Sequence, residues 1–161
     1  MKKYLLDSDI ITYLEEKNSA FHAPVVSQLS RLSNDDEVYI SVLTLYEMQY
    51  GIACVKEEPG KYKKFLAYQN SIKRRFPILP LSEKGAEIYG DIKAMYRKDT
   101  GIQKKPLKKH DVDFILSSTA VEYDLIIVSN DNIFRKIQEI FNNLQVENWT
   151  KNEGNGGANF K

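Results

Sequence analysis

The side chains of this chain that are best suited to chemistry are carboxylates next to short apolar runs, and such runs are typical of buried strands. The acids concerned are Asp7, Asp9, Glu47, Asp111, Asp113 and Asp131. Clustered carboxylates repel one another, and a divalent cation bound between them removes that repulsion. Ligands that are all oxygen favour Mg²⁺ or Mn²⁺ over zinc. Such an ion can activate water and neutralise charge on a phosphodiester under attack.

Each of these acids also has a purely structural interpretation, because a carboxylate at the start of a helix can accept hydrogen bonds from its free N–H groups. Asp7, Asp9 and Asp131 each stand just before an expected helix and could cap it. Glu47 lies three residues after Thr44, so the two could form a capping box. For any one of these residues alone, capping explains the pattern as well as catalysis does.

Asp111 and Asp113 open the expected helix that precedes the most apolar strand, and both could serve the positive N-terminus of that helix. The helical period places them on either side of the apolar stripe that contains Val112. Spacing alone therefore does not decide which of the two belongs to a functional site.

The elements that must position these acids alternate between strand and helix. Strands are expected at 2–6, 37–41, 78–79, 125–128 and 144–149. Helices are expected at 10–17, 23–32, 43–55, 61–75, 82–98, 112–123 and 133–141, with a polar, proline-containing loop at 101–107. This alternation predicts an α/β fold, a three-layer α/β/α sandwich with a mainly parallel central sheet. Ligands of such sheets collect at the carboxyl ends of the strands. Three strand exits deliver carboxylates to that edge, and this shared edge indicates a site.

Length and composition are those of one globular domain. The chain has 161 residues, of which 42% are hydrophobic and 28% charged, so it can bury a core without disulfide or metal staples. We expect a domain at 1–149 and a disordered tail, rich in Gly and Asn, at 150–161. The single cysteine, Cys54, favours a reducing, cytoplasmic location. No secretory signal is expected, and no apolar stretch approaches the ~20 residues of a membrane helix.

The net charge of +1 hides an uneven distribution of charge. A basic run stands just before Asp113 and comprises Lys104, Lys105, Lys108, Lys109 and His110. Basic clusters are usually solvated surface, and they gain meaning as phosphate contacts where an acidic metal site lies close by. We therefore interpret this run as a candidate surface for contacts with the phosphates of a nucleic acid.

Three segments together resemble the PIN-domain nucleases, and among these the VapC-like toxins of bacterial toxin–antitoxin pairs. The start, YLLDSDIITYL, resembles a family opening in which a strand ends in Asp, a hydroxyl residue and usually Asn. ISVLTLYEMQYGI is similar to the second motif, with Glu on the helix after the second strand. DFILSSTAVEYDLIIVSNDNIF resembles the most specific motif, an Asp-led helix followed by a strand and an acidic turn. The closing LQVENW is also typical, so the resemblance spans residues 2–149.

The resemblance implies roles for particular residues. The quartet that would bind the metal and act in catalysis is Asp7, Glu47, Asp113 and Asp131. The supporting positions are Ser8, Asp9, Ser129 and Asn130, with the serines orienting carboxylates or water. The family register favours Asp113 over Asp111. Two positions depart from the family pattern: Asp9 replaces the usual Asn and adds charge, and Ser117-Ser118 replaces a common Ala-Ala pair as a packing variation.

The activity implied by the resemblance is that of a Mg²⁺- or Mn²⁺-dependent endoribonuclease that hydrolyses RNA phosphodiester bonds. The resemblance also implies two protein partners: a cognate VapB-like antitoxin in the active-site groove, and a second copy of the chain in a homodimer. An exposed apolar surface for such contacts would include Tyr46, Met48, Tyr50 and Tyr62.

Two other functions are compatible with the sequence. A haloacid-dehalogenase-like phosphatase would use Asp7 and Asp9 as nucleophile and acid with Mg²⁺. It would leave Glu47 without a role, and it requires a lysine after a later strand. A non-catalytic binding module would keep the fold and have no activity. The acidic cluster disfavours that module, because like charges that serve no function lower stability.

Overall fold

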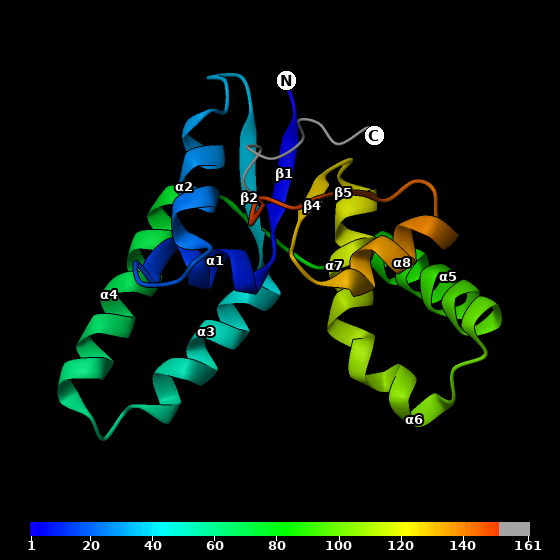
Figure 1. Ribbon diagram of the computed structural model, residues 1–161. Helices are drawn as coiled ribbons and strands as arrows, with labels where there is room; N and C mark the ends of the chain where they lie inside the picture. Colours follow the sequence, from blue (N-terminus) through cyan, green and yellow to red (C-terminus); the bar gives the residue numbers. More distant parts are fainter. Residues whose placement is uncertain (152–161) are drawn as a thin grey trace, which may run out of the picture.

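A parallel sheet with the strand order β3-β2-β1-β4-β5 forms the centre of the fold (Figure 1). Its strands are β1 (Lys3–Leu6), β2 (Glu37–Ser41), β3 (Ile78–Leu79), β4 (Ile126–Val128) and β5 (Gln145–Glu147). The structure, a computed structural model, describes residues 1–151. All pairings between these strands are parallel, so their carboxyl ends share one edge.

Helices cover both faces of this sheet. On one side lie α1 (Ser8–Glu15), α2 (His22–Ser30), α3 (Val42–Cys54) and α4 (Pro59–Arg75) (Figure 1). On the other lie α5 (Glu83–Thr100), α6 (Lys104–Leu107), α7 (Asp111–Glu122) and α8 (Asn132–Ile140). A short 3-10 turn, η1 (Lys108–His110), joins α6 to α7. The expected three-layer α/β/α sandwich is thereby confirmed.

Two apolar cores hold the layers together, and β1 contributes to both because successive side chains of a strand point to opposite faces. Leu5 is buried in the core formed with α5, α7 and α8. Tyr4 and Leu6 are buried in the core formed with α1, α2 and α4. With both faces covered, the central strands have continuous apolar runs, Tyr4 to Leu6 in β1 and Ile126 to Val128 in β4, rather than an alternation of apolar and polar residues.

The register of β1 with its neighbours brings three strand exits level with one another. Leu6 is paired with Ile40 of β2 and with Val128 of β4. Just beyond, the Asp7 N–H donates to the Val128 carbonyl at 3.0 Å. The residues that follow β1, β2 and β4 therefore start from the same edge of the sheet.

Two local expectations are wrong. The predicted loop at 101–107 contains α6, because Gly101 (φ 66°) ends α5 in the left-handed region and the chain then turns back. The capping box that was the alternative interpretation of Thr44 and Glu47 is absent: α3 begins at Val42, and its cap is Ser41, whose hydroxyl accepts from the Leu43 N–H at 3.2 Å. Thr44 lies inside the helix and is buried.

The described helices include none that is long and apolar enough to cross a bilayer. Of the expected tail at 150–161, residues 152–161 lie outside the described residues. Thr150 itself is buried, and its hydroxyl donates to the Asn148 side-chain oxygen at 2.7 Å.

We predict that Phe114→Ala lowers the free energy of unfolding by about 3–5 kcal/mol, because Phe114 of α7 is completely buried in the core shared with α5 and α8 and its removal leaves a cavity. The matched control is Val112→Ala on the same helix, where the side chain is 41% exposed and the loss stays within about 0.5 kcal/mol. Urea denaturation of both variants measures the difference. Equal losses would contradict this description of the core.

Candidate active site

Asp7 lies at the exit of β1 and caps α1. The Ser8 N–H donates to Asp7 Oδ1 at 2.7 Å, and the Ser129 hydroxyl donates to Asp7 Oδ2 at 2.7 Å. Burial raises the Asp7 pKa to about 6, against the lowering effect of these two hydrogen bonds. The negative charges of Asp9 and Asp113 raise the pKa further. Asp7 is therefore a capping residue and also part of an acidic cluster.

Glu47 reaches the same edge from α3. Because the helix begins at Val42, Glu47 stands more than one turn along it, and the residue is exposed. The Ser8 hydroxyl donates to Glu47 Oε2. Ser8 thus contacts two carboxylates, Asp7 through its N–H and Glu47 through its hydroxyl.

Asp113 comes from the first turn of α7. The nearest polar partner of its Oδ2 is His110 Nδ1, at 3.1 Å. Burial raises the Asp113 pKa; the hydrogen bond from His110 lowers it, and the charges of Asp131 and Glu47 raise it again. Asp113 is thereby coupled electrostatically to acids on α3 and after β4.

Asp131 follows β4 and caps α8. Its Oδ1 accepts from the Ile133 N–H at 3.0 Å, and its own N–H donates to the Ser129 hydroxyl at 3.0 Å. Ser129 therefore links Asp131 with Asp7, since the same hydroxyl bonds both.

Asp111 lies two residues from Asp113 but has different partners. Its Oδ1 is 2.5 Å from Lys93 Nζ and accepts from the Tyr89 hydroxyl at 3.2 Å. The hydrogen bond from Lys93 holds the Asp111 pKa below its ordinary value. The structure thus directs Asp111 toward α5 and Asp113 toward the acidic cluster.

The remaining predicted supporting residues lie around this cluster in different ways. Asp9 is exposed in the first turn of α1 and acts on Asp7 through its charge. The side-chain oxygen of Asn130 accepts from Asn148 Nδ2 at 2.8 Å and from the Thr150 hydroxyl at 3.0 Å. Asn130 thereby joins the loop after β4 to the segment after β5.

The donors available for a metal are all carboxylate oxygens. Burial is the main cause of the raised pKa values of Asp7 and Asp113, and the part that neighbouring carboxylates add to them is the repulsion that a cation would remove. Within residues 1–151, however, no three His, Cys, Asp or Glu side chains already converge as a metal-binding group. Each carboxylate instead has a protein partner, such as Ser8 for Glu47 and His110 for Asp113. The donor set fits Mg²⁺ or Mn²⁺, provided that these side chains exchange such contacts for the ion.

An apolar groove of about 330 Å³ begins beside Glu47 and Ser8 and runs between α1, α3 and α4. Its apolar walls are Ile11, Met48, Ile52, Phe65 and Tyr68. Thr44 also lines it, and the buried Thr44 hydroxyl has no hydrogen-bond partner in the described part of the chain. The groove therefore has an apolar floor, with a buried hydroxyl beneath its surface.

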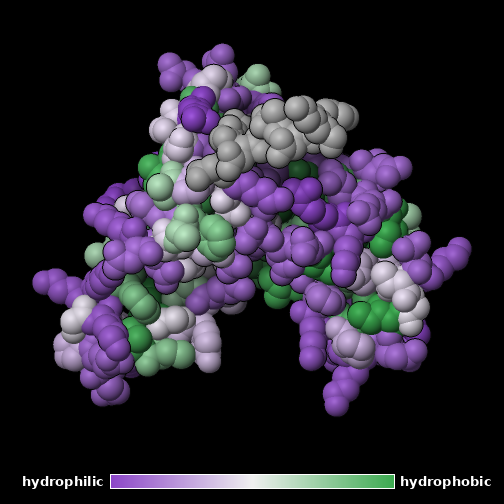
Figure 2. Space-filling model, viewed as in Figure 1, coloured by the Kyte–Doolittle hydropathy of each residue, from purple (hydrophilic) through white to green (hydrophobic). Residues whose placement is uncertain are grey.

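The basic run lies on the side of the acidic cluster that is opposite to the apolar groove. Figure 2 shows the molecule hollowed between one lobe that carries α3 and α4 and another that carries α5 and α6. On the second lobe, Lys104, Lys105 and Lys108 line a pocket together with Lys93 and Arg97 of α5. Lys109 is exposed outside that pocket, and His110 bonds to Asp113.

Sequence reasoning missed Lys93 and Arg97. Their spacing of four residues places both on one face of the expected helix at 82–98, and this spacing could have indicated a basic helix face. The sequence alone does not show that this face meets the basic run.

The comparisons with known proteins point to one family. The sequence pattern of the PIN domain matches residues 4–140. Ribonuclease VapC2 of Rickettsia felis is 26% identical over 149 residues, covering 92% of this chain and 98% of the relative. Ribonuclease VapC of Rickettsia bellii is 28% identical over 137 residues, covering 84% of this chain and 91% of the relative. A crystal structure of VapBC2 from Rickettsia felis, bound to a DNA fragment from their promoter, shares the fold with a TM-score of 0.71 and 24% identity, covering 91% of this chain and 98% of that one.

The raised pKa of Asp7 gives a pH-dependent prediction. A carboxyl whose pKa rises from 3.8 to about 6 on folding stabilises the fold when protonated, and this contribution is lost as the pH rises through 6. We predict that Asp7→Asn increases the unfolding free energy of the metal-free protein at pH 8 by about 1–2 kcal/mol, allowing for solvent screening.

At pH 4 the same substitution should change stability by only about half a kcal/mol, because Asp7 is then protonated in the folded state and only partly ionised in the unfolded state. Urea denaturation with EDTA at both pH values gives the comparison. A gain that is the same at pH 4 and pH 8 would show that ionisation of Asp7 is not its cause.

Proposed function

Because the chain belongs to the PIN-domain family, we propose that it is a divalent-metal-dependent endoribonuclease, the toxin of a VapBC-type toxin–antitoxin pair. The observation that carries this proposal is the electrostatic coupling of carboxylates at a single edge of the sheet. Three of these carboxylates follow strands, and the fourth stands at the start of a helix. The names of the two Rickettsia relatives support RNA as the substrate.

In this proposal Asp7, Glu47 and Asp113 hold Mg²⁺ or Mn²⁺, and Asp131 completes the site directly or through water. When bound, such an ion would supply activation of water and neutralisation of charge on the phosphate oxygens. The chain's own polar groups set the geometry: Ser129 orients the Asp7 carboxylate, and Ser8 holds Asp7 and Glu47 near each other. His110 acts on Asp113 rather than as a general base.

We predict that Asp7→Asn, Glu47→Gln and Asp113→Asn each lower kcat/KM for RNA cleavage at least about 100-fold, because each removes charge that positions the metal. Asp111→Asn is the matched control: it removes the same charge two residues from Asp113, and its carboxylate faces Lys93. It should therefore retain activity. The measurement is cleavage of a labelled RNA with Mg²⁺ and with Mn²⁺.

A result in which Asp111→Asn is as inactive as Asp113→Asn would reject the assignment of Asp113. Wild-type rates in Asp7→Asn would reject the metal centre altogether. Trapping of a phosphoaspartate at Asp7 would instead favour the phosphatase, and absence of divalent-ion binding at millimolar concentration would favour the non-catalytic module.

The groove beside Glu47 is the proposed site for the antitoxin. Its apolar floor suits one face of an amphipathic helix. Glu15, Glu16 and Glu47 lie along it, so a basic side chain on the bound segment would find carboxylates close to the catalytic ones. A segment bound there would cover the active site and block it.

The second proposed partner is another copy of the chain. Tyr46 and Tyr50 are 72% and 74% exposed, and they lie one helical turn apart on α3. Large aromatic side chains this exposed are suited to a protein interface. Met48 and Tyr62 are only partly exposed, and Met48 packs against the core with α1.

We predict that Phe65→Lys raises the Kd for the antitoxin at least about tenfold, because it places an ammonium group in the apolar groove. Phe65 is 38% exposed, so the substitution is tolerated by the fold. Met95→Lys on α5, at 41% exposure, is the matched control and should leave the Kd unchanged. Calorimetric titration with the cognate VapB-like antitoxin measures both. If Met95→Lys raises the Kd as much as Phe65→Lys does, the partner binds outside the apolar groove.

A further inference from the structure

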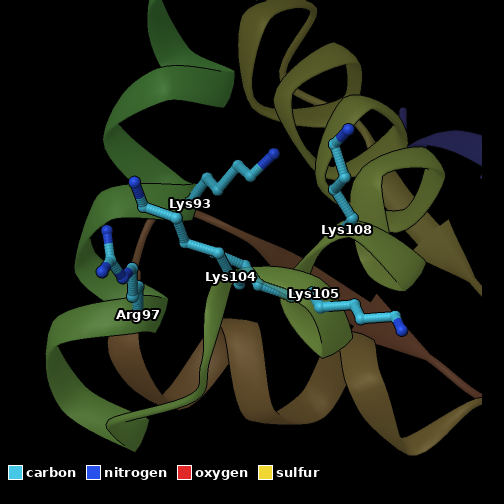
Figure 3. Close-up of a pocket in the computed structure, with 6 residues that line it drawn as sticks. Lys93, Arg97, Lys104, Lys105 and Lys108 are labelled. Atoms are coloured by element: carbon cyan, nitrogen blue, oxygen red, sulfur yellow. The ribbon is translucent and has the colours of Figure 1, made fainter.

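A second concave site lies on the lobe opposite the apolar groove. It is a pocket of about 530 Å³ between α5 and α6. Its lining residues are Lys93, Arg97, Lys104, Lys105, Leu107 and Lys108. Figure 3 shows the five cationic side chains arranged around it, two from α5 and three from α6 and the turn that follows. Leu107 is buried, so the accessible wall is made of the long side chains of these five cationic residues, whose aliphatic parts supply most of its surface.

The fold builds this pocket by turning the chain back on itself. Gly101 ends α5 in the left-handed region, and the chain then returns as α6. Leu107 is buried in the same core as Ile92 and Tyr96 of α5, which fixes α6 against that helix. The i, i+4 pair Lys93 and Arg97 on α5 consequently faces the lysines of α6.

The cations of the pocket are poorly neutralised by the protein. Lys93 pairs with Asp111 at 2.5 Å, and its Nζ also donates to the Tyr89 hydroxyl at 2.7 Å. Arg97, Lys104, Lys105 and Lys108 have no carboxylate within 4.0 Å among the residues that the structure describes. Within the described residues, these four side chains are therefore available to pair with a bound anion.

Two short connections tie the pocket to the acidic cluster. The chain runs from Lys108 through η1 directly into α7, which carries Asp113 in its first turn. The Lys93–Asp111 ion pair anchors the other wall two residues from Asp113. An extended polyanion that has one anionic group at the acidic cluster would therefore run along the pocket.

We infer that this pocket binds a backbone phosphate of the RNA outside the scissile bond, and so positions the strand across the acidic cluster. This inference rests on the proposed ribonuclease function. A guanidinium can grip a phosphate through two parallel hydrogen bonds, and the lysines add point charges. Such contacts fix the register of the strand without reading its bases.

RNA fits the pocket better than an acidic peptide does. A helical peptide needs apolar pockets for its anchoring side chains, whereas this site is lined by flexible Lys and Arg side chains, and its one aliphatic residue, Leu107, is buried. The groove with those features lies beside Glu47, on the other lobe. The two sites therefore suit different classes of molecule.

The test compares Lys104→Gln/Lys105→Gln with Lys73→Gln/Arg74→Gln. Both double variants remove two exposed positive charges, and the control pair lies at the end of α4, before β3 and thus at the amino edge of the sheet. Each pair is placed in an Asp7→Asn background with EDTA, so that RNA is bound but not cut. Fluorescence anisotropy with a 20-nucleotide oligouridylate gives the Kd from low to high salt.

We expect the Lys104/Lys105 variant to bind about tenfold more weakly, and the slope of log K against log salt to fall by about 0.7 for each lost contact. The control pair should change the Kd less than about twofold. Equal Kd values and slopes for the two variants would overturn the inference. Weaker binding of polyglutamate, with RNA binding unchanged, would overturn it in favour of an acidic peptide.

The same variants and the same RNA distinguish a failure of this inference from a failure of the proposed function. RNA bound through the pocket but left uncut by the wild-type protein with Mg²⁺ would reject the nuclease and leave the phosphate site standing. RNA cut by the wild type but bound equally well by both double variants would reject the pocket alone. Absence of any RNA binding would reject both.

Discussion

The structure depends above all on the level register of β1 with β2 and β4. Since Leu6 pairs with Ile40 on one side and Val128 on the other, the chain leaves all three strands at the same height. A slip of one residue in either pairing would point the buried side chains of β1 to the wrong core and move Asp7 away from Ser129. The cores on the two faces therefore also fix the spacing of the carboxylates.

Capping and site formation turn out to be two uses of the same residues. Asp7 caps α1, Asp131 caps α8, and Asp113 stands in the first turn of α7. Helix N-termini supply the positive potential that lets these acids lie close together without a cation. The two interpretations of the acids, which seemed to compete in the sequence, are thus compatible in the fold.

Periodicity was sufficient to predict the layers and the strand at 37–41, because both depend on local apolar patterns. It failed where a side chain's partner comes from elsewhere in the chain. Nothing within the 111–113 segment shows that Asp111 turns toward Lys93, which lies 18 residues earlier. The capping box at Thr44 failed for a different reason: Ser41, at the end of β2, starts the helix earlier. The basic pocket could not be predicted from periodicity either, because it forms only when the chain turns back after Gly101.

The left-handed turn at Gly101 has a consequence for how proteins of this architecture can diverge. The α5–α6 unit is attached to the rest of the fold through buried apolar residues such as Leu107, while its charged side chains stand on the outside. The surface residues of this unit can be substituted, or its connection lengthened, without moving the sheet edge that holds the carboxylates. Under the proposed function, the sheet positions the residues that carry out the chemistry, whereas the α5–α6 unit, which can vary separately, contacts the substrate.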